Sequence, residues 1–268
     1  LCVKAAERLG LPTEEASLGH FGDRRALVLK RYDRTLREGR VARVHQEDFC
    51  QALGVHPSAK YQTDGGPSIE DMVGLLRDAG TSPVEDVKRL CDAVAFNWLT
   101  LGSDAHAKNY SLLLSGREVR LAPLYDLGSL APYDVHGPKV KLAQKVGGEY
   151  RAGSIGERHW RRLASVAKID ADEFVLRVHG FAQAVPDALR SAVHDLEISP
   201  EEAESAAQSA DAIGAWSATC WSALDPPAPA QPGPAGVSAT PRVQGRKPGG
   251  TPRGGQFAST LDEEVEPH

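Results

Sequence analysis

The sequence lacks the cysteine patterns that mark a disulfide framework or a zinc site. Its four cysteines lie at positions 2, 50, 91 and 220, without any Cys-x-x-Cys pair. Such scattered cysteines are typical of small buried hydrophobic residues in a reducing compartment. We therefore expect a cytoplasmic protein without disulfides or bound zinc.

Long apolar runs and a large charge surplus are also missing. No stretch of about 18 apolar residues is present, so no segment is expected to span a bilayer. No basic-then-apolar leader is present either, so we do not expect export. The net charge of −5 gives no general reason to bind nucleic acid or an anionic membrane. What is left is a globular chain of one large or two small domains.

The C-terminal segment, residues 225–268, differs in composition from the rest. It holds nine of the eighteen prolines, abundant glycine and alanine, and almost no large apolar residue. Because this segment cannot bury enough surface to offset its chain entropy, we expect a disordered, solvated tail.

Residues 82–101 predict a long core helix. Ser82-Pro83 is a helix start signal. We expect Trp98 to lie in the core of the protein rather than to serve as a platform for stacking bases. The apolar residues keep the three-to-four spacing of a buried stripe: Val87, Leu90, Cys91, Val94, Trp98 and Leu101.

The loop after this helix, residues 102–111, which we call the polar loop, concentrates chemically active side chains. Phosphoryl transfer needs a carboxylate that takes the proton of the attacking hydroxyl, and oxygen ligands that hold Mg²⁺. Protein kinases place the base and an amide ligand as Asp-x-x-x-x-Asn, with a further metal-binding Asp after a short hairpin. Asp104 and Asn109 have this spacing, and Asp126 follows a hairpin predicted over 112–121. The order favours a kinase-type site; the alternative is an Asx-rich turn capped by its own side chains.

The first 34 residues predict a helix, a strand and a connection. Residues 1–9 form a helical pattern without a capping residue in front, which indicates missing upstream sequence, with a frayed terminus as the alternative. Residues 26–29 predict a buried strand. Lys30 follows the helix, whereas the phosphate-binding lysine of kinases should precede it. We therefore place residues 30–34 on the connection between two lobes, with a surface charge cluster as the alternative.

The remaining segments allow coarser predictions. A loop of polar residues is expected at 37–43 and an amphipathic helix at 45–53. A turn is expected at 60–67, followed by a helix at 68–76 capped by Ser68. Farther on, we expect helices at 160–167, at 174–196 with a break or kink at Pro186, and at 199–224, and a glycine-rich substrate-side loop at 147–156.

Several motifs follow one another along the chain. They are His45-Gln46-Glu47-Asp48, Lys60-Tyr61 with Asp64-Gly65-Gly66-Pro67, Asp104-Ala105-His106-Ala107-Lys108-Asn109, and Leu124-Tyr125-Asp126. Together they resemble the HipA-type serine/threonine kinases, the toxins of bacterial toxin–antitoxin pairs, over residues 1–196. The resemblance implies an α+β, mostly α, protein-kinase-like fold. It would divide into the remnant of a truncated small lobe with the lobe connection at 1–36, a large helical lobe at 37–224, and the tail at 225–268.

Carried over by position, the resemblance implies roles for individual residues. Asp104 would be the catalytic base, and Asn109 and Asp126 would bind Mg²⁺. ATP would be the phosphoryl donor. His106 and Lys108 would lie beside its phosphates. Lys30, Arg31 and Tyr32 would lie on the lobe connection and hold the adenine largely through backbone groups. Asp33 would approach the ribose.

Partners are implied in the same way. The resemblance predicts a helix-turn-helix antitoxin of the HipB kind, an aminoacyl-tRNA ligase as protein substrate, DNA contact only through the antitoxin, and no membrane contact. Two other functions stay open. One is an inactive kinase-fold module that holds an antitoxin or another protein. The other is a metal-dependent phosphoesterase with Asp104, His106 and Asp126 as ligands.

The family's phosphate-binding loop, its regulatory serine and its phosphate-gripping lysine would all lie upstream of Leu1, so we expect a truncated or incomplete kinase. Phosphoryl transfer depends on positioning and electrostatics, so losing that lysine lowers the rate by several powers of ten. We predict that the 268-residue chain alone has little kinase activity. Robust ATP turnover by the purified chain, abolished by Asp104→Asn, would contradict this prediction.

Overall fold

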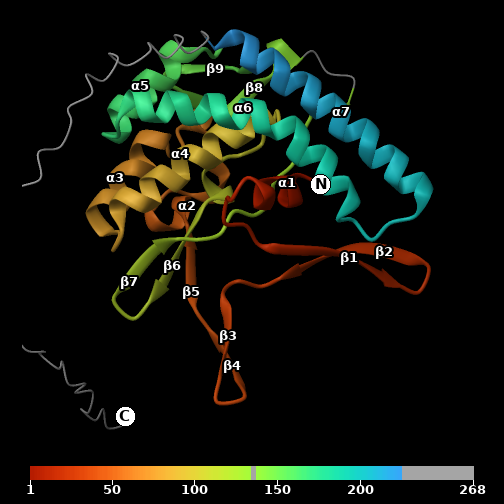
Figure 1. Ribbon diagram of the computed structural model, residues 1–268. Helices are drawn as coiled ribbons and strands as arrows, with labels where there is room; N and C mark the ends of the chain where they lie inside the picture. Colours follow the sequence, from red (N-terminus) through yellow and green to blue (C-terminus); the bar gives the residue numbers. More distant parts are fainter. Residues whose placement is uncertain (134–136, 225–268) are drawn as a thin grey trace, which may run out of the picture. The chain divides into compact units, whose positions relative to one another are not determined.

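The computed structural model describes residues 1–133 and 137–224, so the prediction of a disordered tail lies outside the described residues. In the described part, helices dominate, and four small antiparallel sheets accompany them (Figure 1). The predicted α+β, mostly α class is confirmed.

Helix α4 (Pro83–Leu99) is the core helix that the sequence predicts. It contacts α3 (Ile69–Ala79), α6 (Ala171–His194) and α7 (Pro200–Ala223). Its apolar stripe is buried, and Trp98 is 0% exposed, which confirms its place in the core. Because α4 is covered on several sides, its C-terminal end is a fixed point from which the next loop starts.

The other helices also follow their sequence signals. Helix α1 (Cys2–Arg8) and helix α5 (Glu157–Ala167) both pack against α6. The helix starts predicted by capping residues are confirmed at α3 and α7. Ser68 and Ser199 each accept a hydrogen bond from a backbone N–H three residues on, in reciprocal capping boxes.

Helix α6 continues through Pro186, so of the two predicted outcomes the break does not occur, and the kink stays a prediction. Proline removes one helical hydrogen bond. The flanking residues Val185 and Leu189 are both 0% exposed, so tertiary packing supports the helix on either side. Gly214 of α7 lies against the proline: a Cβ built on it would be 3.5 Å from the Cβ of Pro186.

A three-stranded antiparallel sheet lies beside the helices. Its strands, with β6 in the middle, are β5 (His45–Asp48), β6 (Ser111–Ser115) and β7 (Glu118–Leu121). The hairpin predicted over 112–121 is confirmed. The helix predicted over 45–53 is wrong in its first half, because residues 45–48 pair with β6 as a strand. Helix α2 (Phe49–Ala52) begins only after Asp48, whose carboxylate caps it.

Two hairpins precede this sheet (Figure 1). They are β1 (Glu15–Phe21) with β2 (Arg24–Lys30), and β3 (Arg34–Arg37) with β4 (Arg40–Arg43). The strand predicted over 26–29 exists, but it is exposed rather than buried: Leu27 is 62% exposed, because a two-stranded hairpin covers neither of its own faces. The loop predicted over 37–43 is wrong, since most of it belongs to the second hairpin. The predicted domain boundary at 36/37 falls inside that hairpin and stays a prediction.

The fourth sheet joins β8 (Lys141–Val146) to β9 (Glu149–Arg151). The glycine-rich segment predicted as a loop is the turn of this hairpin and the short helical turn after it. Gly147 and Gly148 both have positive φ, at 54° and 95°, as a two-residue hairpin turn requires.

The four cysteines are buried, as their scattered positions in the sequence predict. All four are free and buried, and burial raises the pKa of each thiol. Among residues 1–133 and 137–224, no helix combines the length and the apolar content needed to cross a membrane.

A buried carboxylate joins β7 to α4. The side chain of Asp86 is 0% exposed and forms ion pairs with Arg89 and Arg120, each at 2.9 Å. The backbone N–H of Leu121 donates a further hydrogen bond to it at 3.0 Å. A buried charge is stable only when it is paired and hydrogen-bonded. This network therefore holds the sheet against the helix that leads to the polar loop.

We predict that Asp86→Asn lowers the free energy of unfolding by about 3 kcal/mol, because it leaves two arginines facing a neutral, buried group. Chemical denaturation monitored by circular dichroism measures the change. Glu85→Gln is the matched control. Glu85 pairs with the same Arg120, but its side chain is 63% exposed, so the loss should stay below about 1 kcal/mol. Equal effects of the two variants would contradict the prediction.

Candidate active site

The polar loop leaves α4 through a tight turn at Leu101 and Gly102. Leu101 has a φ of 55°, and a Cβ on the next residue, Gly102, would lie 2.8 Å from Asn97 Oδ1 and 3.1 Å from the Gly128 carbonyl oxygen. The loop therefore packs closely on the end of the helix. This close approach brings Asp104 next to the segment that follows Asp126.

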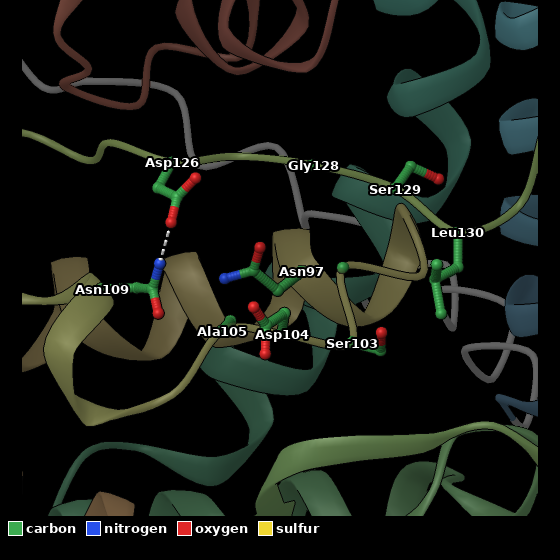
Figure 2. Close-up of a pocket in the computed structure, with 10 residues that line it drawn as sticks. Asn97, Ser103, Asp104, Ala105, Asn109, Asp126, Gly128, Ser129 and Leu130 are labelled. Atoms are coloured by element: carbon green, nitrogen blue, oxygen red, sulfur yellow. Dashed lines mark hydrogen bonds between the residues drawn. The ribbon is translucent and has the colours of Figure 1, made fainter. Parts of the chain in front are cut away.

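Asn109 and Asp126 contact each other directly. Asn109 Nδ2 donates a hydrogen bond to Asp126 Oδ2 at 2.5 Å (Figure 2). The other polar atom of the carboxamide, Asn109 Oδ1, is buried and has no hydrogen-bond partner among the described residues. An unpartnered buried oxygen beside a carboxylate is the arrangement expected of a cation ligand.

Asp126 sits in a left-handed backbone conformation, with a φ of 55°. The preceding segment is held by the N-terminal part of the chain: Thr13 and Leu124 form a parallel β-bridge, and the backbone N–H of Glu14 donates to the Leu124 carbonyl at 2.8 Å. The Glu14 carboxylate in turn accepts a hydrogen bond from the Asp126 N–H at 3.4 Å. Residues more than a hundred positions apart in the sequence thus contact each other and hold Asp126 in this unfavourable conformation.

One pocket of about 260 Å³ is lined by Asp104, Asn109 and Asp126 together. Asn97 and Ser129 also line it, and its walls come from α4, from the polar loop and from the chain after Asp126 (Figure 2). The structure therefore brings together the three residues whose roles the resemblance implied.

Asp104 is exposed and accepts a hydrogen bond at Oδ1 from Tyr61 Oη at 2.6 Å. Within the described residues, its second oxygen, Oδ2, accepts none. The imidazole of His106 lies edge-on to the Tyr61 ring, with 5.1 Å between the ring centroids. Burial, aided by the charge of Lys60, lowers the pKa of His106, so this ring is held neutral. Tyr61 is thus the contact that orients the carboxylate.

Lys108 points to a different partner from the one that the resemblance implied. Its ammonium forms an ion pair with Asp48 Oδ2 at 2.5 Å, and Asp48 caps helix α2. The Lys108 carbonyl accepts a hydrogen bond from Tyr125 Oη at 2.6 Å. These contacts join the polar loop to β5 and to the residue before Asp126.

The segment predicted to connect two lobes, residues 30–34, is a charged cluster with one aromatic side chain. Asp33 is 1% exposed and accepts hydrogen bonds from Arg31 at 2.8 and 2.6 Å and from Arg34. The bonds from Arg31 are the main reason why the pKa of Asp33 is lowered. Lys30 pairs with Glu15 at the surface at 2.8 Å. Residues 30–34 do not line the 260 Å³ pocket.

Tyr32 reaches from this connection toward the site. Its ring lies 6.0 Å from that of Tyr125, with a tilt of 32° between the planes. Burial, together with the nearby charge of Glu14, raises the pKa of Tyr32 to about 12. The residue before Asp126 and the segment at 30–34 therefore share an aromatic contact.

Sequence reasoning assigned no role to Glu14, Tyr61 or Tyr125. The last two lie inside the motifs that resemble the family, so their position was a usable signal. Glu14 had no such signal, because its contact with Asp126 depends on a long-range β-bridge. Burial is the main cause of the raised pKa of Glu14, and the Asp126 carboxylate adds to it.

A multi-ligand metal centre made of histidine, cysteine and carboxylates does not occur in the described part of the chain, where no three such residues converge. The structure therefore gives no support to a phosphoesterase centre built from Asp104, His106 and Asp126. A site of one carboxylate and one carboxamide remains, and Mg²⁺ uses such sites when phosphates supply further oxygens.

This fold and this arrangement of side chains define a lobe of the protein-kinase-like class. Residues 1–189 match the model of the HipA-like C-terminal domain. The chain belongs to this family, and the resemblance drawn from its motifs is confirmed.

Two relatives show how far the similarity extends. Protein Y4mE of Sinorhizobium fredii, whose name gives a provisional kinase assignment, is 34% identical over 194 residues, covering 72% of this chain and 46% of its own. The serine/threonine-protein kinase toxin HipA of Shewanella oneidensis is 27% identical over 205 residues, covering 72% and 47%. The chain thus spans about half the length of these relatives.

Two solved structures are similar in fold. In the Shewanella oneidensis MR-1 complex of HipA, HipB and operator DNA, one chain superposes with a TM-score of 0.72 at 26% identity, covering 81% of this chain and 53% of that one. The Helicobacter pylori proinflammatory kinase CtkA superposes with a TM-score of 0.56 at 15% identity, covering 82% and 83%. At that identity, the second likeness concerns the fold alone.

We predict that Asp104→Asn lowers the pKa of Tyr61 toward the ordinary value of about 10. The hydrogen bond to the Asp104 carboxylate is the main cause of the raised pKa of Tyr61, because it stabilises the neutral phenol. NMR titration of a tyrosine-labelled sample measures the shift. Tyr150 is the control, since its pKa is raised by burial and by Asp64 instead. An unchanged Tyr61 titration would show that the contact is absent in solution.

Proposed function

We propose that this site takes part in transferring the γ-phosphoryl group of ATP to the hydroxyl of a protein serine or threonine. The observation that carries the proposal is the convergence of Asp104, Asn109 and Asp126 on one pocket. Membership of the HipA-like family, and similarity to a serine/threonine-protein kinase toxin, support it.

The residues present fit a magnesium ion. Asn109 Oδ1 is a buried oxygen without a partner among the described residues, and the Asp126 carboxylate lies beside it. Mg²⁺ prefers oxygen ligands and is often held by only one or two protein groups with substrate phosphates and water. Bound with ATP, it would neutralise charge on the phosphates. Asn109 and Asp126 would hold it.

Asp104 would act as the base. Its Oδ1 is oriented by Tyr61, and its Oδ2 accepts no hydrogen bond from the described residues. The free oxygen can take the proton of an incoming hydroxyl as that hydroxyl attacks. A carboxylate needs a fixed orientation for this step, which the bond from Tyr61 provides.

Contacts to the nucleotide by residues 30–33, His106 and Lys108 also stay proposals. The aromatic contact between Tyr32 and Tyr125 supports a nucleobase near the lobe connection, because bases stack on such rings. Lys108 is bound to Asp48 and would have to leave that ion pair to reach a phosphate.

A HipB-like antitoxin is the proposed partner. The support is the similarity to the Shewanella chain, whose structure is a complex with HipB and operator DNA. The chain spans about half of that relative, so the surface available to such a partner depends on which part of HipA the partner contacts. The aminoacyl-tRNA ligase substrate rests on the family resemblance alone.

The test is Mg²⁺-dependent binding of ATP to the chain, measured by isothermal titration calorimetry. Asp126→Asn should weaken binding at least about tenfold, because a metal ligand is lost. Asp78→Asn is the matched control: it removes one carboxylate from an exposed position of α3 and should leave the affinity unchanged. Binding that is equal with and without Mg²⁺, or equal in the two variants, would contradict the proposal. No binding would favour the inactive module.

A further inference from the structure

One segment of this acidic protein is strongly basic. Residues 137–162 contain seven lysines and arginines but only two glutamates, whereas the whole chain has a net charge of −5. Its basic residues are Lys139, Lys141, Lys145, Arg151, Arg158, Arg161 and Arg162.

The segment folds into the β8–β9 hairpin and helix α5, and the hairpin lies directly beside Asp104. The backbone N–H of Ala143 in β8 donates to the carbonyl of Ser103, the residue before Asp104, at 2.9 Å. Two residues on, the N–H of Lys145 donates to Gln62 Oε1 at 2.8 Å, next to Tyr61. Strand β8 therefore bridges the loop of the proposed base and the loop of the tyrosine that orients it.

Basic side chains on this hairpin are exposed and form no ion pairs within the described part of the chain. Lys141, Lys145 and Arg151 are all exposed, and none forms an ion pair with another described residue. Lys141 and Arg151 lie opposite each other in the register, and Lys145 Nζ lies 5.0 Å from the centre of the Tyr150 ring. Glu149 in the same hairpin lies near Arg151 but forms no ion pair with it, and like charges that face each other repel, so a negative partner would stabilise the arrangement.

The hairpin is a preformed surface. A Cβ on Gly147 would lie 2.2 Å from the carbonyl oxygen of His159 in α5, so the turn is pressed against that helix. Gly153, just beyond β9, is packed as tightly: a Cβ there would lie 2.5 Å from the Cα of Pro138. Such a surface loses little conformational entropy on binding.

We infer that the exposed face of the β8–β9 hairpin binds an acidic segment of the protein that supplies the hydroxyl. This rests on the proposed function, because the face borders the carboxylate that would accept the proton. Aspartates and glutamates near the phosphorylated residue would pair with Lys141, Lys145 and Arg151. We favour a polypeptide over a nucleic acid, since Lys145 already lies over one face of the Tyr150 ring, where a base would otherwise stack.

The test is the binding of fluorescent peptides to the chain in the absence of ATP, followed by anisotropy. One peptide carries a serine flanked by glutamates and aspartates; the other has glutamines and asparagines in their place. The chain should bind the acidic peptide at least about tenfold more tightly than the neutral one, and added salt should weaken that binding. Equal binding of the two peptides would overturn the inference.

Charge reversal locates the surface. The triple variant Lys141→Glu, Lys145→Glu, Arg151→Glu should lose at least about tenfold in affinity for the acidic peptide. The matched control Arg24→Glu, Arg40→Glu, Arg43→Glu changes the net charge equally at exposed positions of the two N-terminal hairpins, and its affinity should stay within about twofold. Should the first variant not fold, the milder Lys141→Gln, Lys145→Gln, Arg151→Gln should still lose part of the binding. Equal losses in reversal variant and control, or tighter binding of single-stranded RNA than of the acidic peptide, would overturn the inference.

Failure of this inference can be told apart from failure of the proposed function. If the chain binds Mg²⁺ and ATP but does not prefer the acidic peptide, the proposed phosphoryl-transfer site stands and the inferred acidic substrate is wrong. A chain that binds the acidic peptide through the hairpin but not Mg²⁺ and ATP would keep the surface and lose the kinase assignment.

Discussion

The hydrogen bond from Asn109 to Asp126 is the contact on which the rest of the site depends. It closes the β6–β7 hairpin at its base, joining the end of the polar loop to the segment after β7. Asp126 adopts a left-handed conformation, which is unfavourable for residues with a side chain, although aspartate tolerates it better than most. The bond to Asn109 and the backbone hydrogen bonds of Pro12 and Glu14 with Leu124 offset that cost. Because the carboxamide donates with its nitrogen, its oxygen is left without a hydrogen-bond partner among the described residues.

The supports of the site come from distant parts of the chain. Residues 12–14 hold the segment before Asp126, Tyr61 orients Asp104, and Asp86 fixes the sheet on α4. Each support is a polar contact at or below the surface of a helical core. Hydrogen bonds of this kind hold reactive side chains in a fixed orientation before any ligand binds.

Local signals in the sequence were sufficient for much of this structure. Helix α4, its start at Ser82-Pro83, the loop and the hairpin after it all follow from spacing and caps that lie close together in the chain. The same holds for the capping boxes of α3 and α7. Asp104, Asn109 and Asp126 could be grouped because the elements between them are short and regular.

Long-range pairing accounts for the errors. Residues 45–48 have a helical composition but become a strand because β6 offers them hydrogen-bond partners. Residues 26–29 are apolar enough for a core, yet nothing in their own composition says that the finished fold leaves them uncovered. Glu14 belongs to the site only through the bridge between Thr13 and Leu124, which no local pattern announces.

The burial of all four thiols has a practical consequence. A thiol reacts as its thiolate, and burial in apolar surroundings both raises the pKa and blocks access. A single cysteine introduced on an exposed strand would therefore be the preferred target of a maleimide dye or a nitroxide. Such an introduced cysteine could therefore be labelled site-specifically without first removing the four native cysteines.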